Sequence, residues 1–238
     1  MVVPAYNEEP RLPDTLPTML DFLRYRPYGW ELRVVDDGSE DGTREVVQAF
    51  AAEHPQVVLQ AEPHRGKGGA VRAGMLASEA EYRFICDADL SMPVEQIERF
   101  LPPRRGPYEV AIASREIQGA RRIGEPPSRH LMGRVFNRLV QSLIIPGIED
   151  TQCGFKMFTG EAADALFPRQ TIDGWAFDVE ILFLAYLMGF RIIEVPVDWY
   201  YMERSQIRPF TDAKRMVEEI LHIRANHFKG LYDEVKRR

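Results

Sequence analysis

The sequence predicts an α/β fold in which a mostly parallel sheet is flanked by helices. Its 238 residues are 45% hydrophobic, which is enough to build the core of one large domain. Over the first half of the chain, short apolar runs of strand length alternate with stretches of helical periodicity. This alternation is typical of parallel strands joined by helices that cover both faces of the sheet.

The elements of the first half follow from these patterns in chain order. We expect buried strands at Leu32–Asp36, Val57–Ala61, Tyr82–Cys86 and Val110–Ser114. Helices are expected at Thr43–Glu53, from Ala70 to about Glu79, and at Pro93–Phe100.

The second half is less regular. Glu116–Ser128 contains glycine, proline and arginine and is expected to be a loop. Further elements are expected as helices at His130–Ile145, Gly160–Phe167, Val179–Met188 and Asp212–His227, and as a strand at Arg191–Val197. No repeat or low-complexity linker divides the sequence, so we predict a single domain over residues 1–238.

Composition argues against several classes of function. The net charge of -6 argues against nucleic-acid binding through bulk charge. The 2 cysteines and 5 histidines match no zinc-binding spacing, and neither a Ser/His/Asp set nor a GxSxG motif is present. A zinc site and a covalent hydrolase are therefore not expected.

The sequence also bears on membrane association. We expect no leader, because Val2 follows Met1 directly, and the abrupt start suggests a first strand that has lost residues on its N-terminal side. No apolar stretch reaches the roughly 20 residues that a membrane-spanning helix needs. We expect a cytoplasmic protein, soluble or peripheral at the inner face of the membrane.

Polar residues follow four of the apolar runs. These clusters are Pro4-Ala5-Tyr6, Asp36-Asp37, Asp87-Ala88-Asp89 and Ser114-Arg115. In open α/β sheets, ligands bind beyond the carboxyl ends of the strands. The clusters are therefore expected to meet in one crevice.

Asp87 and Asp89 are the sharpest local signal. Alternate residues of an extended segment point the same way, so the two carboxylates could share one Mg²⁺ or Mn²⁺. Such an ion would neutralise charge on a departing diphosphate. In the alternative, one aspartate caps the next helix and the other is solvated. Their position after Phe84-Ile85-Cys86 favours the metal site.

Two other loops could hold a nucleotide. Asp36 or Asp37 could accept hydrogen bonds from a base or a ribose, form an Asx-turn, or divide these roles. Lys67 lies in the loop Arg65–Gly69 before a helix, where backbone N–H groups attract phosphate. This loop has neither Walker A nor GxGxxG spacing, and a flexible turn with solvated charges is an equal alternative.

Two features of the second half have both a functional and a structural interpretation. The segment Arg115–Arg138 holds six arginines against two glutamates beside an amphipathic helix, which suits an anionic lipid headgroup. On the pattern alone, a core-facing helix with a solvated basic face is favoured. Asp178 and Glu180, near a helix start, could act as a base or orienting groups, or could cap the helix.

With these motifs in place, the sequence resembles the family 2 inverting glycosyltransferases of the GT-A fold, a Rossmann-like fold. The resemblance rests on residues 2–9, 35–43 and 87–89 in the first half. Residues 65–72, 150–158 and 175–180 are similar to dolichyl-phosphate β-glucosyltransferases. This resemblance implies UDP-glucose as the donor, a polyprenyl or dolichyl phosphate as the acceptor, and inversion at the anomeric carbon.

The resemblance also implies roles for individual residues. Residues 1–115 would form the nucleotide-sugar-binding part and residues 116–238 the acceptor-binding part. The nucleoside would contact Pro4, Ala5, Tyr6, Glu8 and Asp37, with Asp36, Lys67 and Ala88 also on the nucleotide-sugar side. The metal would be held by Asp87 and Asp89, with Ser91 as a further polar ligand. Arg115 and Arg129 would face the acceptor phosphate, and Arg204 the donor diphosphate.

The sequence departs from the family in two places. Relatives carry Gly-Ser-Lys where this chain has Arg204-Ser205-Gln206, which weakens the diphosphate assignment, although Arg208 could substitute. We do not expect the N-terminal membrane anchor of eukaryotic relatives in this chain, so membrane contact would be peripheral or depend on an anchored partner protein.

The implied reaction is a single displacement by the acceptor phosphate, which is already anionic and needs no strong base. Alternatives within the class are UDP-N-acetylglucosamine or GDP-mannose as donor, or a soluble acceptor. A hydroxyl acceptor would give Asp178 or Glu180 the role of base. Outside the class, the chain could be a nucleotide-sugar-binding regulator without turnover, or a scaffold with a membrane-binding helix.

Overall fold

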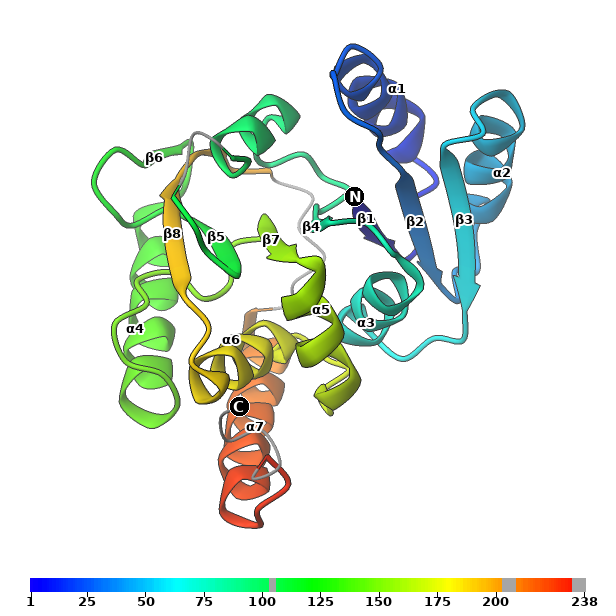
Figure 1. The fold of residues 1–238 in the computed structure, drawn as a ribbon. Helices are drawn as coiled ribbons and strands as arrows, with labels where there is room; N and C mark the ends of the chain where they lie inside the picture. Colours follow the sequence, from blue (N-terminus) through cyan, green and yellow to red (C-terminus); the bar gives the residue numbers. More distant parts are fainter. Residues whose placement is uncertain (103–105, 203–208, 233–238) are drawn as a thin grey trace.

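The computed structural model describes residues 1–102, 106–202 and 209–232, and it describes residues 209–213 by their backbone only. Seven strands form one sheet in the order β3-β2-β1-β4-β7-β5-β8 (Figure 1). Their bounds are β1 Val2–Ala5, β2 Leu32–Asp37, β3 Val57–Glu62, β4 Tyr82–Ile85, β5 Val110–Ser114, β7 Lys156–Thr159 and β8 Ile192–Pro196. β7 runs antiparallel to β4 and β5, and the other pairings in this sheet are parallel. The predicted mostly parallel sheet is confirmed.

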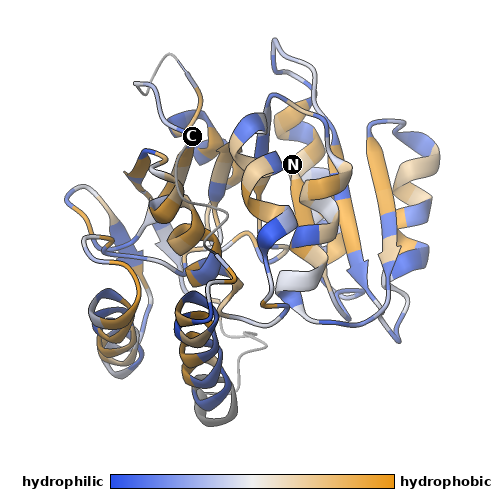
Figure 2. Ribbon diagram, turned by 60° about the horizontal axis from the view of Figure 1, so that its bottom comes forward, coloured by the Kyte–Doolittle hydropathy of each residue, from blue (hydrophilic) through white to orange (hydrophobic). Residues whose placement is uncertain are grey.

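Helices cover both faces of this sheet (Figure 1). The helices are α1 Leu12–Leu23, α2 Thr43–Glu53, α3 Lys67–Ala77, α4 Pro127–Leu143, α5 Gly160–Leu166, α6 Phe177–Met188 and α7 Pro209–Phe228. Two short 3₁₀ helices are η1 Val94–Arg99 and η2 Phe167–Arg169. In Figure 2 the strands are mostly hydrophobic, while several of the surrounding helices are striped with hydrophilic residues.

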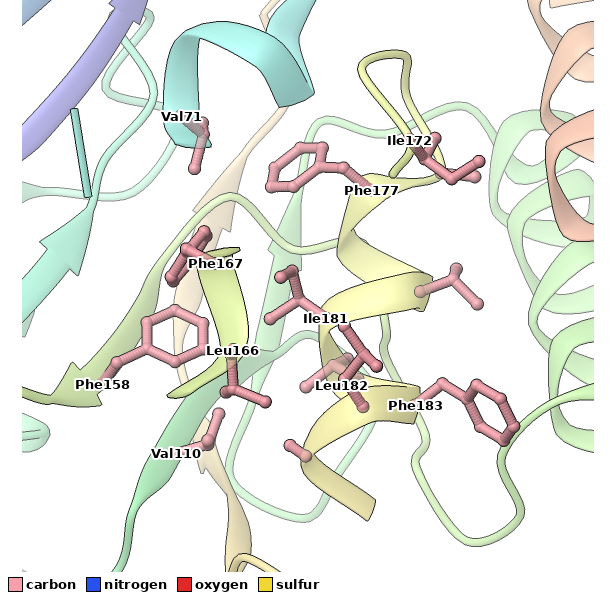
Figure 3. Packing of buried hydrophobic residues seen from close by; sticks show 14 of the residues in the cluster. Val71, Val110, Phe158, Leu166, Phe167, Ile172, Phe177, Ile181, Leu182 and Phe183 are labelled. Carbon is pink, nitrogen blue, oxygen red and sulfur yellow. The ribbon is translucent and has the colours of Figure 1, made fainter. Parts of the chain in front are cut away.

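Alternation along the strands builds a separate core on each face. Val2 and Val3 of β1 belong to different hydrophobic clusters, because successive side chains of a strand point to opposite faces. One cluster packs α3, α5 and α6 against the sheet, and Figure 3 shows Phe158 of β7 beside Phe167 and Leu166 within it. The other cluster joins the sheet to α1, α2 and η1.

Some elements differ from the sequence-based expectation. The predicted loop Glu116–Ser128 contains β6 (Arg121–Ile123), which pairs in parallel with β9 (Asp198–Tyr200), and it also contains the start of α4. The segment Pro93–Phe100 forms the 3₁₀ helix η1 rather than an α-helix. α1 and β7 were not predicted. The pattern of α1 is obscured by Pro13 in its first turn and Pro17 inside it.

A membrane-spanning helix would need both length and continuous apolar sequence. Among the helices of the described residues, none combines the two.

Candidate active site

The polar residues that follow β1, β2 and β4 lie at one edge of the sheet. β1 pairs in parallel with both β2 and β4, so Tyr6, Asp37 and Asp87 lie at or just beyond the carboxyl ends of adjacent strands. β5 runs in the same direction on the other side of β7 and ends at Ser114, next to Arg115. The four clusters therefore lie along one edge of the observed sheet, the edge at which ligands bind in open α/β sheets.

Asp87 is held between a lysine and a glycine. Its Oδ1 atom lies 2.6 Å from Nζ of Lys67, the first residue of α3. This buried oxygen accepts no hydrogen bond of good geometry from the described residues, so the ammonium meets it as a counter-ion. Burial lowers the pKa of Lys67, but Asp87 and Asp178 outweigh it and the net shift is upward. The site thus already attracts a cation to Asp87.

Gly154 packs closely against the other oxygen, Oδ2, of the same carboxylate. A Cβ atom on Gly154 would lie 2.0 Å from Oδ2 of Asp87, so the loop and the carboxylate touch only because residue 154 has no side chain. Gly154 lies in the loop that leads into β7, which pairs with β4. Asp87 is thereby fixed by contacts from both α3 and the β7 loop.

The Asp89 side chain forms a hydrogen bond within its own loop. Its Oδ1 accepts the N–H of Ser91 at 2.9 Å, and Leu90 between them has a φ of 47°. Ser91 is buried, and its carbonyl accepts the N–H of Tyr200 at 2.7 Å. A groove of about 490 Å³ borders this loop and is lined by Asn7, Glu8, Pro10, Arg11, Asp14, Thr15, Thr18, Asp89, Leu90 and Met202.

The donor set suits a hard divalent cation. Asp87 and Asp89 offer carboxylate oxygens, and Ser91 offers a hydroxyl, which are the ligands that Mg²⁺ and Mn²⁺ prefer. No cluster of three or more carboxylate, histidine or cysteine groups able to hold a metal occurs in the part of the chain that the structure describes. Further coordination positions would therefore fall to phosphate oxygens and water.

The predicted nucleoside residues surround the end of β1. Pro4 and Ala5 pair with Val35 and Asp36 of β2, and Ala5 is buried in the core. The ring of Tyr6 stacks on His64 with centroids 4.3 Å apart, a contact that the sequence did not predict. Burial raises the pKa of Glu8 despite its ion pair with Arg11, and nearby Asp89 adds to the shift. Ala88 is buried, and its carbonyl accepts the Thr15 hydroxyl at 2.8 Å.

Asp36 and Asp37 order two loops. Asp36 is fully buried, accepts the N–H of Ser39 at 3.2 Å and pairs with Arg44 at 2.5 Å. Asp37 accepts the N–H groups of Arg65 and Gly66, both at 2.9 Å, which fixes the loop before Lys67. The turn-forming interpretation therefore describes both residues, and a nucleoside contact by Asp37 remains a prediction.

The two arginines that are predicted to face the acceptor are engaged within the protein. Arg115 binds Asp150 in bidentate fashion, with Nε–Oδ2 and Nη2–Oδ1 distances of 2.7 and 2.9 Å. Burial opposes ionisation of Asp150, but Arg115 holds the pKa of this carboxyl below its usual value. The Arg115 guanidinium also lies over the ring of Trp199, and that of Arg129 lies over Tyr201.

The basic segment 115–138 is partly neutralised from within. Glu116 pairs with Arg122, His130 and Arg134. A cavity of about 30 Å³ lies beside this network and is lined by Arg115, Glu116, Arg122, Gly133, Arg134, Asn137, Glu149, Asp150, Thr151 and Gln152. On α4, Val140 packs into the core while Leu131, Met132 and Val135 are exposed. The helix therefore has both a core-facing side and an exposed apolar side.

We expect Asp150→Asn to lower the free energy of unfolding by about 3 kcal/mol, because it leaves the partly buried Arg115 without its counter-charge. Urea titration would measure the loss. Asp21→Asn is the control, since Asp21 forms an exposed ion pair with Arg24. A loss no larger than that of the control, which should stay near 0.5 kcal/mol, would contradict this interpretation of the pair.

The two acids at the start of α6 occupy different environments. Glu180 is fully buried and accepts hydrogen bonds from Thr171, Ile172 and Tyr232. These bonds anchor the loop before α6 and engage both carboxylate oxygens of Glu180, and a role for Glu180 as a base remains a prediction. Asp178 is 6% exposed and pairs with Lys156 at 2.8 Å. Arg204, predicted to face the donor diphosphate, lies outside the described residues.

Three residues of this site were not assigned a role from the sequence alone. Asp150, Gly154 and Lys156 all belong to the segment 150–158, which contributed to the family resemblance. No periodicity or metal-ligand spacing marks them individually. Their contacts arise because β7 inserts between β4 and β5.

Comparison with known proteins identifies the family of the chain. The sequence pattern of glycosyl transferase family 2 matches residues 1–167. A dolichyl-phosphate beta-glucosyltransferase of Dictyostelium discoideum is 34% identical over 98% of this chain and 75% of its own length. The human dolichyl-phosphate beta-glucosyltransferase is 35% identical over 98% of this chain and 76% of its own length.

Solved structures share the fold. A glucosyl-3-phosphoglycerate synthase from Mycobacterium tuberculosis, crystallised with Mn²⁺, uridine diphosphate and glucosyl-3-phosphoglycerate, aligns with a TM-score of 0.65 at 16% identity. The alignment covers 93% of this chain and 76% of that one. Together with the family match and the relatives, this places the chain in glycosyl transferase family 2, as a glycosyltransferase of the GT-A fold.

Proposed function

We propose that the protein transfers glucose from UDP-glucose to dolichyl phosphate or another polyprenyl phosphate, with inversion at the anomeric carbon. The observation that carries the proposal is the cation-attracting Asp87 beside Asp89, on the same sheet edge as Arg115. The names of the relatives support the choice of sugar and acceptor.

On the donor side, Asp87, Asp89 and Ser91 would hold Mg²⁺ or Mn²⁺. When bound, this ion would neutralise charge that develops on the departing diphosphate. Lys67 adds a second positive charge at the same place, since its ammonium can exchange Asp87 for a phosphate oxygen. Tyr6 and His64 present a stacked aromatic pair beside the loop that Asp37 orders, which suits a nucleoside base.

On the acceptor side, the anionic phosphate needs positioning and charge compensation more than a base. Arg115 and Arg129 would supply positive charge, with Arg115 held in a fixed plane by Asp150 and Trp199. Asp178 is paired with Lys156, which leaves it poorly placed to accept a proton from a substrate. This arrangement favours a phosphate over a hydroxyl acceptor.

The prenyl chain of such an acceptor lies in a bilayer, so the protein must reach a membrane surface. The exposed side chains Leu131, Met132 and Val135 of α4 lie in the same helix as Arg134 and Arg138. Apolar and basic groups on one helix favour peripheral contact with an anionic membrane. We place this contact at the cytoplasmic face.

A transfer assay with purified protein tests the proposal. UDP-[¹⁴C]glucose and dolichyl phosphate in detergent, with Mn²⁺ or Mg²⁺, should give a lipid-soluble product and free UDP. NMR of the product should show the β anomer. UDP release without a lipid product would exclude the prenyl phosphate acceptor, and an α-linked product would exclude a single displacement.

A further inference from the structure

A buried ion pair, Lys156–Asp178, lies near the partly exposed Asp87–Lys67 pair. Nζ of Lys156 is 2.8 Å from Oδ1 of Asp178, and their side chains are only 1% and 8% exposed. The same ammonium donates to the carbonyl oxygen of Cys153 at 2.5 Å. Lys156 is the first residue of β7, and Asp178 lies in the first turn of α6.

The two ion pairs are close because α3 and α6 begin side by side. A Cβ atom on Gly68, in the first turn of α3, would lie 2.7 Å from Cβ of Phe177. In Figure 3, Phe177 at the start of α6 points toward Val71 of α3. Burial raises the pKa of Asp178, and Lys156 and then Lys67 oppose this shift. Lys67 therefore acts on two carboxylates, Asp87 and Asp178.

A fully buried lysine at the start of a strand needs an explanation other than stability. Well-packed apolar residues of similar volume are often at least as stabilising as a buried ion pair. The ion pairs Asp87–Lys67 and Asp178–Lys156 together carry no net charge, and Lys67 acts electrostatically on both carboxylates; we call these four residues the charged row. Within this row, Lys156 determines how much negative charge Asp178 presents to Lys67.

We propose that Lys156 is a positioning residue for donor binding: it neutralises Asp178, so that Lys67 stays directed at Asp87 and at a diphosphate bound beside it. Among the described residues, Lys67 is the cation with the next largest effect on Asp178 after Lys156, so without Lys156 its ammonium would turn away from Asp87. The inference rests on the proposed function, because it assumes a nucleoside diphosphate at Asp87.

Calorimetric titration of the full chain with UDP and Mn²⁺ tests this role. Lys156→Met should weaken UDP binding about tenfold, the size expected for one charge-assisted contact to a phosphate. Lys67→Met should weaken it by a similar factor. The double variant Lys67→Met/Lys156→Met should bind no more than about twofold weaker than Lys67→Met alone, because Lys156 acts through Lys67. The proposal would be overturned if Lys156→Met left UDP binding unchanged. It would also be overturned if Lys156→Met weakened UDP binding by the same factor in the wild-type protein and in Lys67→Met.

A rescue variant separates positioning from folding. Lys156→Met/Asp178→Asn removes both buried charges, so Lys67 should return to Asp87 and UDP affinity should recover to within about threefold of wild type. This variant also keeps the proposal testable if Lys156→Met does not fold. An affinity as low as that of Lys67→Met would overturn it. Arg83→Met is the matched control, since Arg83 is another buried cation, paired with Asp164 on α5, and its loss should leave UDP affinity unchanged.

Crystal structures of Lys156→Met and of Lys156→Met/Asp178→Asn add a readout that does not depend on the donor. In Lys156→Met, Nζ of Lys67 should lie within 4 Å of the Asp178 carboxylate, the distance of an ion pair. In Lys156→Met/Asp178→Asn, Nζ of Lys67 should remain at Asp87. Lys67 still bound to Asp87 in Lys156→Met would contradict the inference. If wild type binds no UDP, the proposed donor fails, while the position of Lys67 still decides the role of Lys156.

Discussion

Asp89→Asn is expected to lower kcat/KM for sugar transfer by about 10³-fold, because it removes one of the two carboxylates that would hold the metal. The substitution keeps the size of the side chain and an oxygen that can accept the N–H of Ser91. The fold should therefore persist, and the loss should appear in metal-dependent UDP binding and in turnover. Steady-state kinetics and calorimetry at saturating Mn²⁺ would measure both.

Asp164→Asn provides the control for Asp89→Asn. Asp164 pairs with Arg83 of β4 from α5, away from the carboxyl end of the strand where Asp87 lies. Its loss should change stability more than catalysis. If Asp89→Asn keeps UDP affinity and turnover within threefold of this control, Asp89 has no part in metal binding.

Gly154→Ala is expected to lower kcat/KM by about 10²-fold while the protein remains folded. The new Cβ atom would lie 2.0 Å from Oδ2 of Asp87, so the carboxylate or the loop must move by about an ångström or more. Displacements of that size at a catalytic group cost on the order of 10²-fold in rate. The free energy of unfolding should fall by about 1–3 kcal/mol, as in other overpacked sites.

Gly29→Ala is the matched comparison for Gly154→Ala. No atom lies within 4 Å of a Cβ built on Gly29, and Gly29 precedes the start of β2, at the opposite end of the strand from Asp37. Its stability and turnover should stay near those of wild type, with a stability change within about 0.5 kcal/mol. Gly154→Ala with the same turnover as Gly29→Ala would show that the contact with Asp87 is unimportant for catalysis.

The sequence predicted the buried parallel strands well, because continuous apolar runs mark them. Val110–Ser114 matches the observed β5, and Leu32–Asp36 differs from β2 by one residue. β7 was missed because it is four residues long and begins with Lys156, which is charged although buried. Its antiparallel insertion between β4 and β5 cannot be inferred from local periodicity.

The site was predictable in outline but not in its internal contacts. Position after a strand located Asp87 and Asp89 at the carboxyl edge of the sheet. Residue type alone did not distinguish Glu180, which anchors a loop, from Asp178, which belongs to the charged row. The contacts of Asp87 with Lys67 and Gly154 join residues far apart in sequence, so they depend on the tertiary packing of α3 and the β7 loop.

A donor titration would test the proposed function directly. Wild-type protein would be titrated calorimetrically with UDP-glucose, UDP-N-acetylglucosamine and GDP-mannose, first with Mn²⁺ or Mg²⁺ and then with a chelator. We predict that UDP-glucose binds most tightly and that chelation abolishes its binding. Preference for another nucleotide sugar would overturn the glucosyl assignment, and binding of UDP-glucose that is equally tight with and without metal would contradict the role given to Asp87 and Asp89.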